Sequence, residues 1–481
     1  MNQKSIVWSI GGSDCSGGAG CQADILTCRD FNVHAASIIT IITAQNADQV
    51  LKINYCDSDL IQKQIQALKE TLPPTVIKLG LLGTKEIVTD VASYLENYSG
   101  RVVCDPVLSS TSGVLLHTSD YLDSLKKIIF PHVDLLTPNI PEAEILIQSK
   151  IHTFSDIISA ARQLLKWGVS AVLLKGGHLI GSKARDFFTD GKSEFWLEHK
   201  KIPKTRVRGT GCALSSAISS AVALGYSLKD AIVIAKMYVQ QGIRRNFKVN
   251  TQELMGRQGF PQQSIDLPWV TKNSNFKRKS FPLCNLFDFY PIVDSVEWVE
   301  RLLSYGVRII QLRIKNTSPQ KIKKAVIESV ALARRYQAKL FINDYWKLAV
   351  EAGAYGVHLG QEDLETADLS AIRAANLRLG ISTHTLYELS RAHAIQPSYV
   401  AFGPIYETYS KPMPYSPRGL EWLRYWCEIS PYPVVAIGGI NLSRLESVLN
   451  AGAVSVVVIS AVTKSKTPQK TVRAFLNRCR H

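Results

Sequence analysis

The chain has 481 residues, of which 46% are hydrophobic and 20% charged, as expected for a soluble globular protein with two or three domains. It contains no apolar run long enough to span a bilayer and no signal-peptide pattern at its N-terminus, so we expect no membrane partner. The nine cysteines show neither metal-ligand nor disulfide-framework spacing, which favours a reducing cytoplasm. The net charge is +16, but no basic stripe with interleaved aromatic residues is present, so we expect small anionic substrates and no nucleic acid.

Residues 1–265 alternate short β-branched runs with longer helical patterns. Near-continuous apolar strands that alternate with helices are typical of a mostly parallel sheet covered on both faces. We therefore expect an α/β/α sandwich in this half, with strands at Ser5–Gly11, Ala36–Thr43, Val76–Leu81, Arg101–Pro106, Val133–Leu136 and Ala171–Leu174.

Two glycine-rich turns stand where a helix is expected to begin. One is the run from Gly11 to Gly20, and the other is Gly209-Thr210-Gly211-Cys212, which opens a run of small and apolar residues. A helix start leaves about four backbone N–H groups unpaired and carries roughly half a positive charge, so both turns suit a phosphate or a developing oxyanion. A thiolate of Cys212 would be favoured there. The alternative is a tight turn in which Cys212 is a small apolar filler.

Polar residues follow several of the predicted strands. The amide of Gln45 could pair with an aminated heterocycle. Asp105 and Glu142 lie at strand ends, where carboxylates face the ligand crevice of an α/β sheet and could hold a hard cation. Lys175 stands beside two glycines, which suits a phosphate contact. The alternatives are a loop cap for Gln45, helix capping by Asn139 or Glu142, and a plain strand exit for Lys175.

The segment from Ile265 to Phe281 breaks the alternating pattern. It holds a proline, polar residues and the basic cluster Lys277-Arg278-Lys279. This composition is typical of a linker. We therefore expect a first domain over residues 1–265, a linker over 266–282 and a second domain over 283–481.

Residues 283–481 alternate strand-like runs with helical patterns. The expected strands are Phe287–Val293, Val307–Ile314, Lys339–Asn343, Tyr355–Leu359, Arg378–Ser382, Tyr399–Gly403, Pro433–Gly438 and Ser455–Ser460. Eight such units in roughly 200 residues predict a (β/α)₈ TIM barrel, in which chemistry lies at the carboxyl ends of the strands.

The strand ends of this predicted barrel hold charged and polar side chains. Alternation places Gln311, Arg313 and Lys315 on one face, where two inward cations would be costly without an anion. Asp344 and Asp363 follow neighbouring strands and could share a Mg²⁺. The other candidates at strand ends are Asn343, Ser382, Thr408, Ser410, Lys411, Gly439 and Ser460. Any one of them could be a solvated loop residue, but their joint position favours a site.

The first half resembles the hydroxymethylpyrimidine and phosphomethylpyrimidine kinases, which have a ribokinase-like fold. The strings GGSDCSGGAGCQADI, ITAQN, VIKLGLLG, DPV, LLTPNIPEAE, LLKGGH and GTGCALSSA carry the resemblance over roughly residues 5–245. It implies phosphorylation of a pyrimidine alcohol and then of its phosphate, with MgATP. The implied pyrimidine contacts are Gly12, Asp24 and Gln45, the implied ATP and magnesium shell is Asp105, Asn139, Glu142 and Lys175, and the implied anion hole is Gly209, Gly211 and Cys212. Cys212 stands where related sugar kinases have an aspartate base.

The second half resembles thiamine-phosphate synthase over about residues 286–465. The matching strings are GVRIIQLRIK, FINDYWKLA, GVHLGQEDL, YETYSKP and VVAIGGI. The resemblance implies a magnesium site at Asp344 and Asp363. It also implies pyrimidine diphosphate contacts by Gln311, Arg313, Lys315, Asn343, Ser382 and Lys411, and thiazole phosphate contacts by Thr408, Ser410, Gly439 and Ser460.

The two resemblances are consecutive steps, which favours a bifunctional enzyme of thiamine biosynthesis. The kinase would make the diphosphate that the barrel consumes. The expected cofactor is Mg²⁺, with ATP as co-substrate, and the expected assembly is a homodimer through the kinase domain. The alternative is a pyridoxal-type kinase fused to a tautomerase-like or regulatory barrel. Such a barrel should lack the diphosphate-binding set.

Overall fold

The computed structural model describes residues 4–46, 48–109, 116–118, 120–176, 182–202, 207–250, 252–274, 276, 278–284, 289–408 and 415–479. The chain divides into two compact units. Unit 1 comprises Met1–Pro261 and Asp266–Phe276, and unit 2 comprises Gln262–Ile265 and Lys277–His481. Within the described ranges, no helix is long and apolar enough to cross a membrane.

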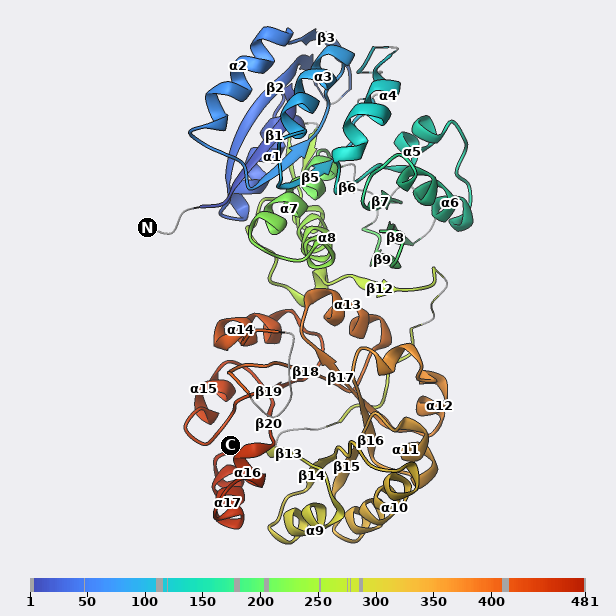
Figure 1. The fold of residues 1–481 in the computed structure, drawn as a ribbon, viewed down its shortest axis with the longest axis vertical. Coiled ribbons are helices and arrows are strands. Elements are labelled where there is room, and N and C mark those ends of the chain that lie inside the picture. Colours follow the sequence, from blue (N-terminus) through green and yellow to red (C-terminus); the bar gives the residue numbers. More distant parts are fainter. Residues whose placement is uncertain are drawn as a thin grey trace. The chain divides into compact units, whose positions relative to one another are not determined.

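Unit 1 is built on a ten-stranded sheet (Figure 1). The described strands lie in the order β12-β9-β8-β7-β6-β5-β4-β1-β2-β3. The strands from β7 to β2 run parallel, whereas β3, β8, β9 and β12 each join a neighbour antiparallel. The elements are β1 (Ile6–Asp14), α1 (Gly20–Asp30), β2 (His34–Gln45), β3 (Val50–Tyr55), α2 (Ser58–Lys69), β4 (Val76–Leu79), α3 (Lys85–Leu95), β5 (Arg101–Cys104), α4 (Tyr121–Ser124), η1 (Leu125–Ile129), η2 (Phe130–His132), β6 (Leu135–Leu136), α5 (Ile140–Ile147), α6 (Phe154–Leu165), β7 (Val172–Lys175), β8 (Lys183–Thr189), β9 (Glu194–Lys200), α7 (Thr210–Ala223), α8 (Leu228–Arg244), β10 (Phe247–Val249), β11 (Gln252–Leu254), η3 (Ser264–Asp266) and β12 (Trp269–Thr271).

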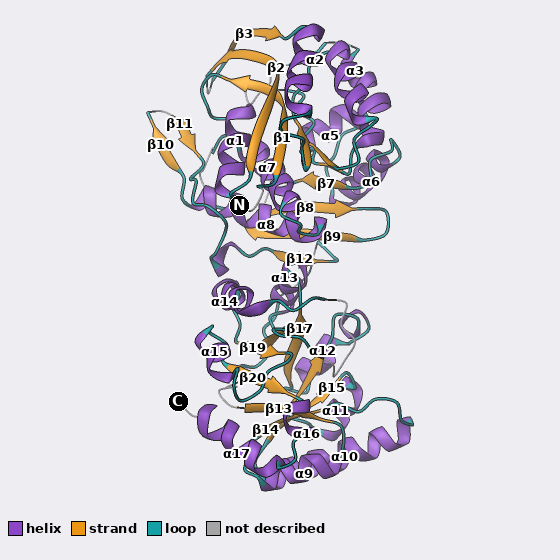
Figure 2. Ribbon diagram, turned by 60° about the vertical axis from the view of Figure 1, so that its left-hand side comes forward, coloured by secondary structure: helices purple, strands orange, loops and turns teal. Residues whose placement is uncertain are grey.

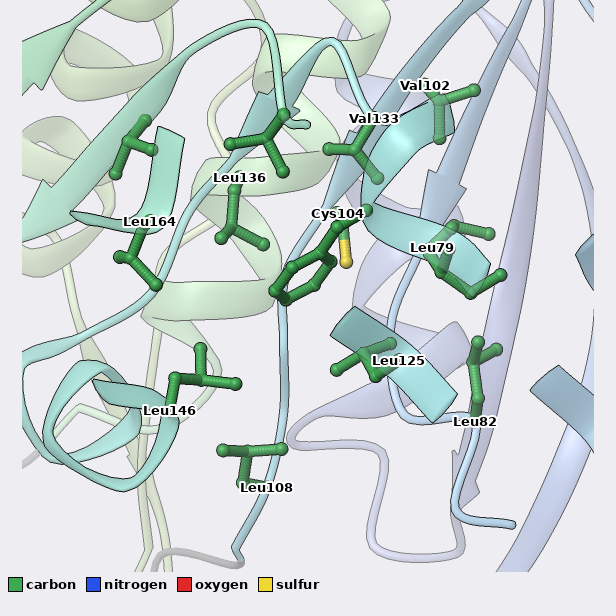
Figure 3. Packing of buried hydrophobic residues seen from close by; sticks show 14 of the residues in the cluster. Leu79, Leu82, Val102, Cys104, Leu108, Leu125, Val133, Leu136, Leu146 and Leu164 are labelled. Carbon is green, nitrogen blue, oxygen red and sulfur yellow. The ribbon is translucent and has the colours of Figure 1, made fainter. Parts of the chain in front are cut away.

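The two faces of this sheet differ in polarity, because successive side chains of a strand point to opposite faces. Trp8, Ile10 and Leu79 belong to a buried apolar cluster that includes residues of α2, α3 and α6, part of which Figure 3 shows. Ser9 and Lys78, which alternate with them on β1 and β4, instead bind Asp24 of α1, whose carboxylate also accepts a hydrogen bond from Ser216 of α7. The sheet therefore has one apolar face and one face with a polar network beneath α7.

The mostly parallel α/β fold predicted for the first half is confirmed. Each strand predicted there corresponds to one of the parallel strands, while the antiparallel strands were missed. One of these, β12, lies inside the predicted linker and pairs with β9. This part of the expected linker is therefore a strand of the sheet.

Unit 2 is a closed barrel of parallel strands, β13 to β20 in chain order, which confirms the predicted barrel. In Figure 2 its helices, in purple, lie outside the orange strands. Its elements are β13 (Phe289–Val293), α9 (Val296–Ser304), β14 (Ile309–Leu312), α10 (Pro319–Arg335), β15 (Lys339–Asn343), α11 (Trp346–Ala352), β16 (Gly356–Leu359), η4 (Asp363–Glu365), α12 (Leu369–Ala374), β17 (Arg378–Thr383), α13 (Leu386–Ile395), β18 (Tyr399–Phe402), α14 (Gly419–Ile429), β19 (Val434–Ile437), α15 (Leu445–Asn450), β20 (Ser455–Val458), α16 (Ser460–Thr463) and α17 (Pro468–Cys479).

The last residues of the predicted linker pack on this barrel. Phe281 is buried, and the guanidinium carbon of Arg373 lies 4.2 Å from the centre of its ring. The hydroxyl of Ser398 donates to the carbonyl of Pro282 at 2.7 Å. The barrel fold therefore begins before β13.

Candidate active sites

The two glycine-rich turns of unit 1 pack against each other. Gly209 has a φ of +75°, and a Cβ on it would lie 2.2 Å from the carbonyl oxygen of Gly18. Gly20 has a φ of +61°, and a Cβ there would lie 2.4 Å from the carbonyl oxygen of Gly12. Only glycine fits at Gly209 and Gly20, because the left-handed backbone and the close contact both exclude a side chain. Gly209 is the N-cap of α7, as the sequence predicted.

An ion pair lies at the carboxyl ends of β5 and β7, against the start of α7. Lys175 Nζ is 2.6 Å from Asp105 Oδ1, and a Cβ on Gly211 would lie 3.4 Å from Lys175 Nζ. Thr137 and Ser215 also donate hydrogen bonds to the Asp105 carboxylate, at 3.2 and 3.5 Å. The structure therefore brings Asp105, Lys175 and the second glycine turn together at one edge of the sheet.

Both members of this ion pair are charged at neutral pH. Burial by itself would raise the pKa of Asp105, but Lys175 and Lys78 outweigh this effect and hold the pKa below its usual value. Burial would likewise lower the pKa of Lys175, and Asp105 and Glu142 reverse this and raise it. A permanently charged lysine at a helix start is suited to phosphate oxygens.

Asn139 and Glu142 form a capping box at the start of α5. Asn139 Oδ1 accepts the Glu142 backbone N–H at 2.8 Å, and Glu142 Oε2 accepts the Asn139 backbone N–H at 2.7 Å. The capping interpretation is therefore confirmed for both residues. Burial, opposed by Lys175 and assisted by Asp105, raises the pKa of Glu142 to about 7. This carboxyl group thus lies within electrostatic reach of the ion pair and titrates near neutrality.

Cys212 is the third residue of α7 and is partly buried. Burial raises the pKa of its thiol to about 11, with Lys78 acting in the opposite direction and Asp24 and Asp105 in the same one. The thiol is therefore neutral at physiological pH, and the expectation that a thiolate is favoured in this turn is wrong. Burial and two nearby carboxylates outweigh the positive end of the helix.

Gly12 lies among the last residues of β1, and Gln45 is the last residue of β2. A Cβ on Gly12 would lie 3.4 Å from the Leu81 side chain, so this backbone is closely covered on one side. Gln45 ends β2 and is partly exposed, and its backbone N–H donates to the Cys15 thiol sulfur at 3.4 Å. The first glycine turn and the end of β2 are therefore neighbours.

Asp24 lies in the protein interior rather than at the glycine turns. Its carboxylate is bound by Ser9 Oγ at 2.6 Å, Lys78 Nζ at 2.7 Å and Ser216 Oγ at 2.7 Å. Asp24 and Lys78 are almost completely buried. Lys78 was not predicted as a functional residue, although a lysine inside the apolar strand sequence VIKL was a visible signal. This network ties β1, β4, α1 and α7 together one helical turn beyond Cys212.

A second pair that was not predicted from the sequence connects the two glycine turns. Arg208 Nη2 is 3.7 Å from Asp14 Oδ2, and Arg208 Nη1 donates to Ser16 Oγ at 3.4 Å. Both charged side chains are more than nine-tenths buried. The available signal was an arginine directly before the second glycine turn.

The barrel places two carboxylates side by side at its strand ends. Asp344 has a left-handed backbone with a φ of +64°, and its carboxylate is bound by the ammonium group of Lys315. Asp363 accepts the backbone N–H of Gly360 at 3.1 Å. Burial and the facing Asp344 raise the pKa of Asp363. Two carboxylates that repel each other are a suitable donor set for a hard divalent cation.

A chain of hydrogen bonds crosses the barrel interior from Gln311 to Ser382. Gln311 donates to the Tyr290 hydroxyl at 3.1 Å, which lies 2.9 Å from the Tyr399 hydroxyl. The Tyr399 hydroxyl lies 2.8 Å from His358 Nδ1, and His358 Nε2 lies 2.9 Å from Ser382 Oγ. Burial lowers the pKa of His358 to about 4, so its imidazole is neutral. The two tyrosines were not recognised from sequence because aromatic residues in buried strands look like core.

The remaining candidates lie around the barrel strand ends. Asn343 is buried at the end of β15, Arg313 and Thr408 are partly buried, and Ser460 is exposed as the first residue of α16. A Cβ on Gly439 would lie 2.4 Å from the carbonyl oxygen of Glu407, so this glycine packs on the loop after β18. Ser410 and Lys411 lie outside the described residues. No group of three or more His, Cys, Asp or Glu that could hold a metal occurs among the residues that the structure describes.

Comparisons with known proteins assign a family to each unit. Residues 14–256 match the family model of phosphomethylpyrimidine kinase, and residues 289–462 match that of thiamine monophosphate synthase. A chloroplastic thiamine biosynthetic bifunctional enzyme of Arabidopsis thaliana is 30% identical over 495 residues, which cover 97% of this chain and 93% of that protein. This chain belongs to the family of bifunctional thiamine biosynthetic enzymes. It combines a phosphomethylpyrimidine kinase domain and a thiamine-phosphate synthase domain, both of which are transferases, as predicted.

Relatives of the single units agree with this family. The thiamine-phosphate synthase of Yersinia pseudotuberculosis is 53% identical over 189 residues, 39% of this chain and 88% of that protein. A pyridoxal kinase of Staphylococcus aureus, solved with AMP-PCP and pyridoxal, is 27% identical with a TM-score of 0.50, and covers 56% of this chain and 98% of its own. The kinase relatives imply ATP as co-substrate, and they identify the sheet of unit 1 as ribokinase-like.

Proposed function

We propose that unit 1 phosphorylates the hydroxymethylpyrimidine alcohol and then its monophosphate with MgATP. Unit 2 then joins the resulting diphosphate to thiazole phosphate, giving thiamine phosphate and pyrophosphate. The observation that carries the proposal is that each unit gathers its charged side chains at the carboxyl ends of parallel strands, where α/β sheets and barrels bind ligands. A relative that spans both units supports consecutive reactions in one chain.

Phosphoryl transfer in unit 1 needs positive charge, a held phosphoryl group and an oriented acceptor. Lys175, fixed by Asp105, supplies charge to the ATP phosphates. The backbone N–H groups of the Gly209–Cys212 turn form the anion hole, while Gly12 and Gln45 hold the pyrimidine. Because its thiol is neutral, Cys212 orients the acceptor rather than taking its proton. Asp24 acts from below, by fixing α7 through Ser216.

Magnesium fits the carboxylates of both units. In unit 1 the shell is Asp105, Asn139 and Glu142, and the raised pKa of Glu142 reports a carboxyl group that a nearby cation would stabilise in its charged form. In unit 2 the repulsion between Asp344 and Asp363 has the same meaning. When bound, the cation neutralises negative charge on phosphate oxygens.

Thiamine phosphate formation breaks the bond between the pyrimidine methylene carbon and the diphosphate oxygen, and the thiazole nitrogen then bonds to that carbon. Negative charge gathers on the leaving pyrophosphate, where preorganised cations stabilise it. The diphosphate contacts are Gln311, Arg313, Lys315, Asn343 and Lys411. Ser382 lies near the pyrimidine, and the neutral His358 fixes the direction of its hydroxyl group. The thiazole phosphate contacts are Thr408, Ser410, Gly439 and Ser460.

The experiment is to incubate the intact chain with MgATP, the pyrimidine alcohol and thiazole phosphate. Thiamine phosphate should form, with one ADP released for each phosphoryl transfer. Supplying the pyrimidine diphosphate without ATP should bypass unit 1. No product from the diphosphate would contradict the synthase assignment, and product from the diphosphate but not from the alcohol would contradict the kinase assignment. The homodimer through unit 1 stays a prediction, which sedimentation of the intact chain would test.

Pyridoxal phosphorylation is the second candidate for unit 1, because a pyridoxal kinase of Staphylococcus aureus has a similar structure. Both acceptors are aromatic nitrogen rings with a hydroxymethyl group. We expect the pyrimidine alcohol to be preferred, since the Gln45 amide can pair with an amino group and a ring nitrogen. Measuring kcat/KM for both acceptors decides between them, and a preference for pyridoxal would reassign unit 1.

A further inference from the structure

Arg208 is the residue before the N-cap of α7, and its side chain lies over the first glycine turn. Its guanidinium carbon is 3.6 Å from the position of a Cβ on Gly18, and its nitrogens reach Asp14 and Ser16. The Arg208 side chain is 9% exposed and that of Asp14 is 2% exposed. A buried cation therefore stands between the two turns assigned to the acceptor and to the transferred phosphoryl group.

The hydrogen bonding of this buried pair is incomplete. Among the described residues, neither Arg208 Nε nor Asp14 Oδ2 has a hydrogen-bond partner, although both atoms are buried. The 3.7 Å between Arg208 Nη2 and Asp14 Oδ2 is too long for a hydrogen bond, whereas Lys175 and Asp105 are 2.6 Å apart. Buried charged donors without partners are costly. Arg208 therefore has donors left for a ligand.

The two phosphoryl transfers of unit 1 place different demands on this space. In the first, the alcohol oxygen bonds to the γ-phosphorus of ATP, its proton passes to an oxygen of the transferred phosphoryl group or to solvent water, and ADP leaves as the bond to the bridging oxygen breaks. In the second, an oxygen of the pyrimidine monophosphate makes the same attack, but this group is already ionised and carries about −1.5 to −2 charges at neutral pH. The second transfer therefore needs an additional cation for the acceptor.

We propose that Arg208 binds the phosphate group of the pyrimidine monophosphate and so selects it as the acceptor of the second phosphoryl transfer. The inference rests on the proposed function of unit 1. A guanidinium group matches phosphate oxygens with two parallel hydrogen bonds, which a lysine cannot reproduce. Asp14 holds the guanidinium between the glycine turns until the phosphate arrives, and its own Oδ1 is already fixed by Ser16.

The test compares the alcohol and the monophosphate as acceptors for the intact chain with MgATP, in Arg208→Gln and Arg208→Lys. In Arg208→Gln, kcat/KM for the monophosphate should fall about 10–100-fold, as for loss of a charged hydrogen-bonding partner. The value for the alcohol should fall less than about 3-fold, so the monophosphate accumulates. Arg208→Lys keeps the positive charge, so its kcat/KM for the monophosphate should lie between the values of Arg208→Gln and the wild type.

The matched control is Arg101→Gln, which removes an exposed arginine paired with Asp134 and should change neither value. Equal losses for both acceptors in both Arg208 variants would make Arg208 only a structural link between the turns and would overturn the inference. A ratio of kcat/KM for the monophosphate to kcat/KM for the alcohol that is the same in the Arg208 variants as in the wild type would overturn it as well. A wild-type chain that does not accept the monophosphate at all would instead remove the second phosphorylation from the proposed function, and the inference with it.

Discussion

Unit 1 buries Lys78, Lys175 and Lys236, each against an aspartate at 2.5 to 2.7 Å, whereas the barrel interior holds a chain of uncharged amide, hydroxyl and imidazole groups. The charges of the barrel site stand at its rim, where Lys315 meets Asp344. A buried ion pair is costly to break because the remaining charge has no counterion. Removing one member of the uncharged hydrogen-bond chain in the barrel leaves no unpaired charge behind. The two units should therefore respond differently to loss of one charged residue: unit 1 in stability, and the barrel in activity.

The largest effect is expected from removing either carboxylate at the barrel rim. Asp344→Ala and Asp363→Ala should each reduce thiamine phosphate formation from supplied diphosphate by about 10³-fold or more. The reason is that the negative charge on the leaving pyrophosphate is then no longer stabilised. Phosphorylation of the pyrimidine alcohol should be unchanged. Glu351→Ala, which removes an exposed carboxylate paired with Lys323, is the control. If the wild-type synthase step runs equally well after Mg²⁺ is chelated, the metal assignment is wrong.

The next effect concerns the stability of unit 1. Lys78→Met leaves the Asp24 carboxylate buried without its cation and should lower the free energy of unfolding by about 3–5 kcal/mol. The synthase reaction, followed during urea unfolding, should keep its midpoint, while kinase activity is lost at lower urea. Adding Asp24→Asn should recover much of the loss, since no charge is then stranded. A single variant as stable as the wild type would show that the pair contributes nothing.

A smaller effect is expected from the position at which the chain is divided. A fragment ending at residue 265 lacks β12 and Asp266, a fully buried carboxylate bound by Arg244 at 2.6 Å. Fragment 1–276 should therefore be more stable than fragment 1–265 by roughly 2 kcal/mol or more, as for a hydrogen bond between charged groups.

Fragment 277–481 keeps Phe281 and its contact with Arg373, so it should likewise be more stable than fragment 283–481. Mixed at micromolar concentration, fragments 1–276 and 277–481 should make thiamine phosphate from the alcohol. Tethering raises effective concentration only where the geometry allows, so a longer lag than in the intact chain is acceptable. An insoluble barrel fragment would mean that the two units depend on each other to fold.

The parts of this molecule that were predictable from sequence are those with a local pattern. The parallel strands are short apolar runs, and their positions were predicted correctly. The glycine turn before α7 was also predicted correctly, because no residue other than glycine fits at Gly209. The antiparallel strand β12 was read as linker because three residues with a nearby proline have no strand period of their own. It is a strand only because the edge of β9 is available to pair with it.

The site itself divides in the same way. Residues at strand ends, such as Asp105 and Lys175, were identified because topology alone brings strand ends together. The protonation state of Cys212 was not, since it depends on burial and on Asp24 and Asp105, which lie far away in sequence. Arg208 was overlooked for the same reason, because its partner Asp14 lies 194 residues earlier in the chain.

Cys212 offers a smaller test of this comparison in rate. Because burial raises the pKa of its thiol to about 11, the group is neutral between about pH 7 and 9. Cys212→Ser should therefore keep activity within about 10-fold, whereas loss of a general base costs roughly 10²–10⁴-fold. The pH profile of kcat between about pH 7 and 9 should be the same in both proteins. A loss above 100-fold, together with a rise of kcat with pH that is present in the wild type and absent from the variant, would restore Cys212 as the base.

The last effect is expected from Glu142→Gln, measured without ligands, and it depends on pH. The pKa of Glu142 is raised from 4.5 to about 7, so the folded protein binds this proton more tightly than the unfolded chain. The stabilisation is complete below pH 4.5 and is lost as the pH rises through 7. Glutamine cannot ionise, and it preserves the capping box at the start of α5.

Near pH 4.5 the variant and the wild type should therefore unfold at similar urea concentrations. At pH 8 the variant should be more stable, by about 1.4 kcal/mol for each unit by which the pKa of Glu142 in the folded protein exceeds its value in the unfolded chain. Glu351→Gln, on an exposed side chain, should show no such pH dependence. A constant difference between variant and wild type across this range would mean that Glu142 is ionised throughout. In that case the cations already present in unit 1 would neutralise its buried carboxylates. The raised pKa of Glu142 would then no longer support a magnesium ion in the proposed shell.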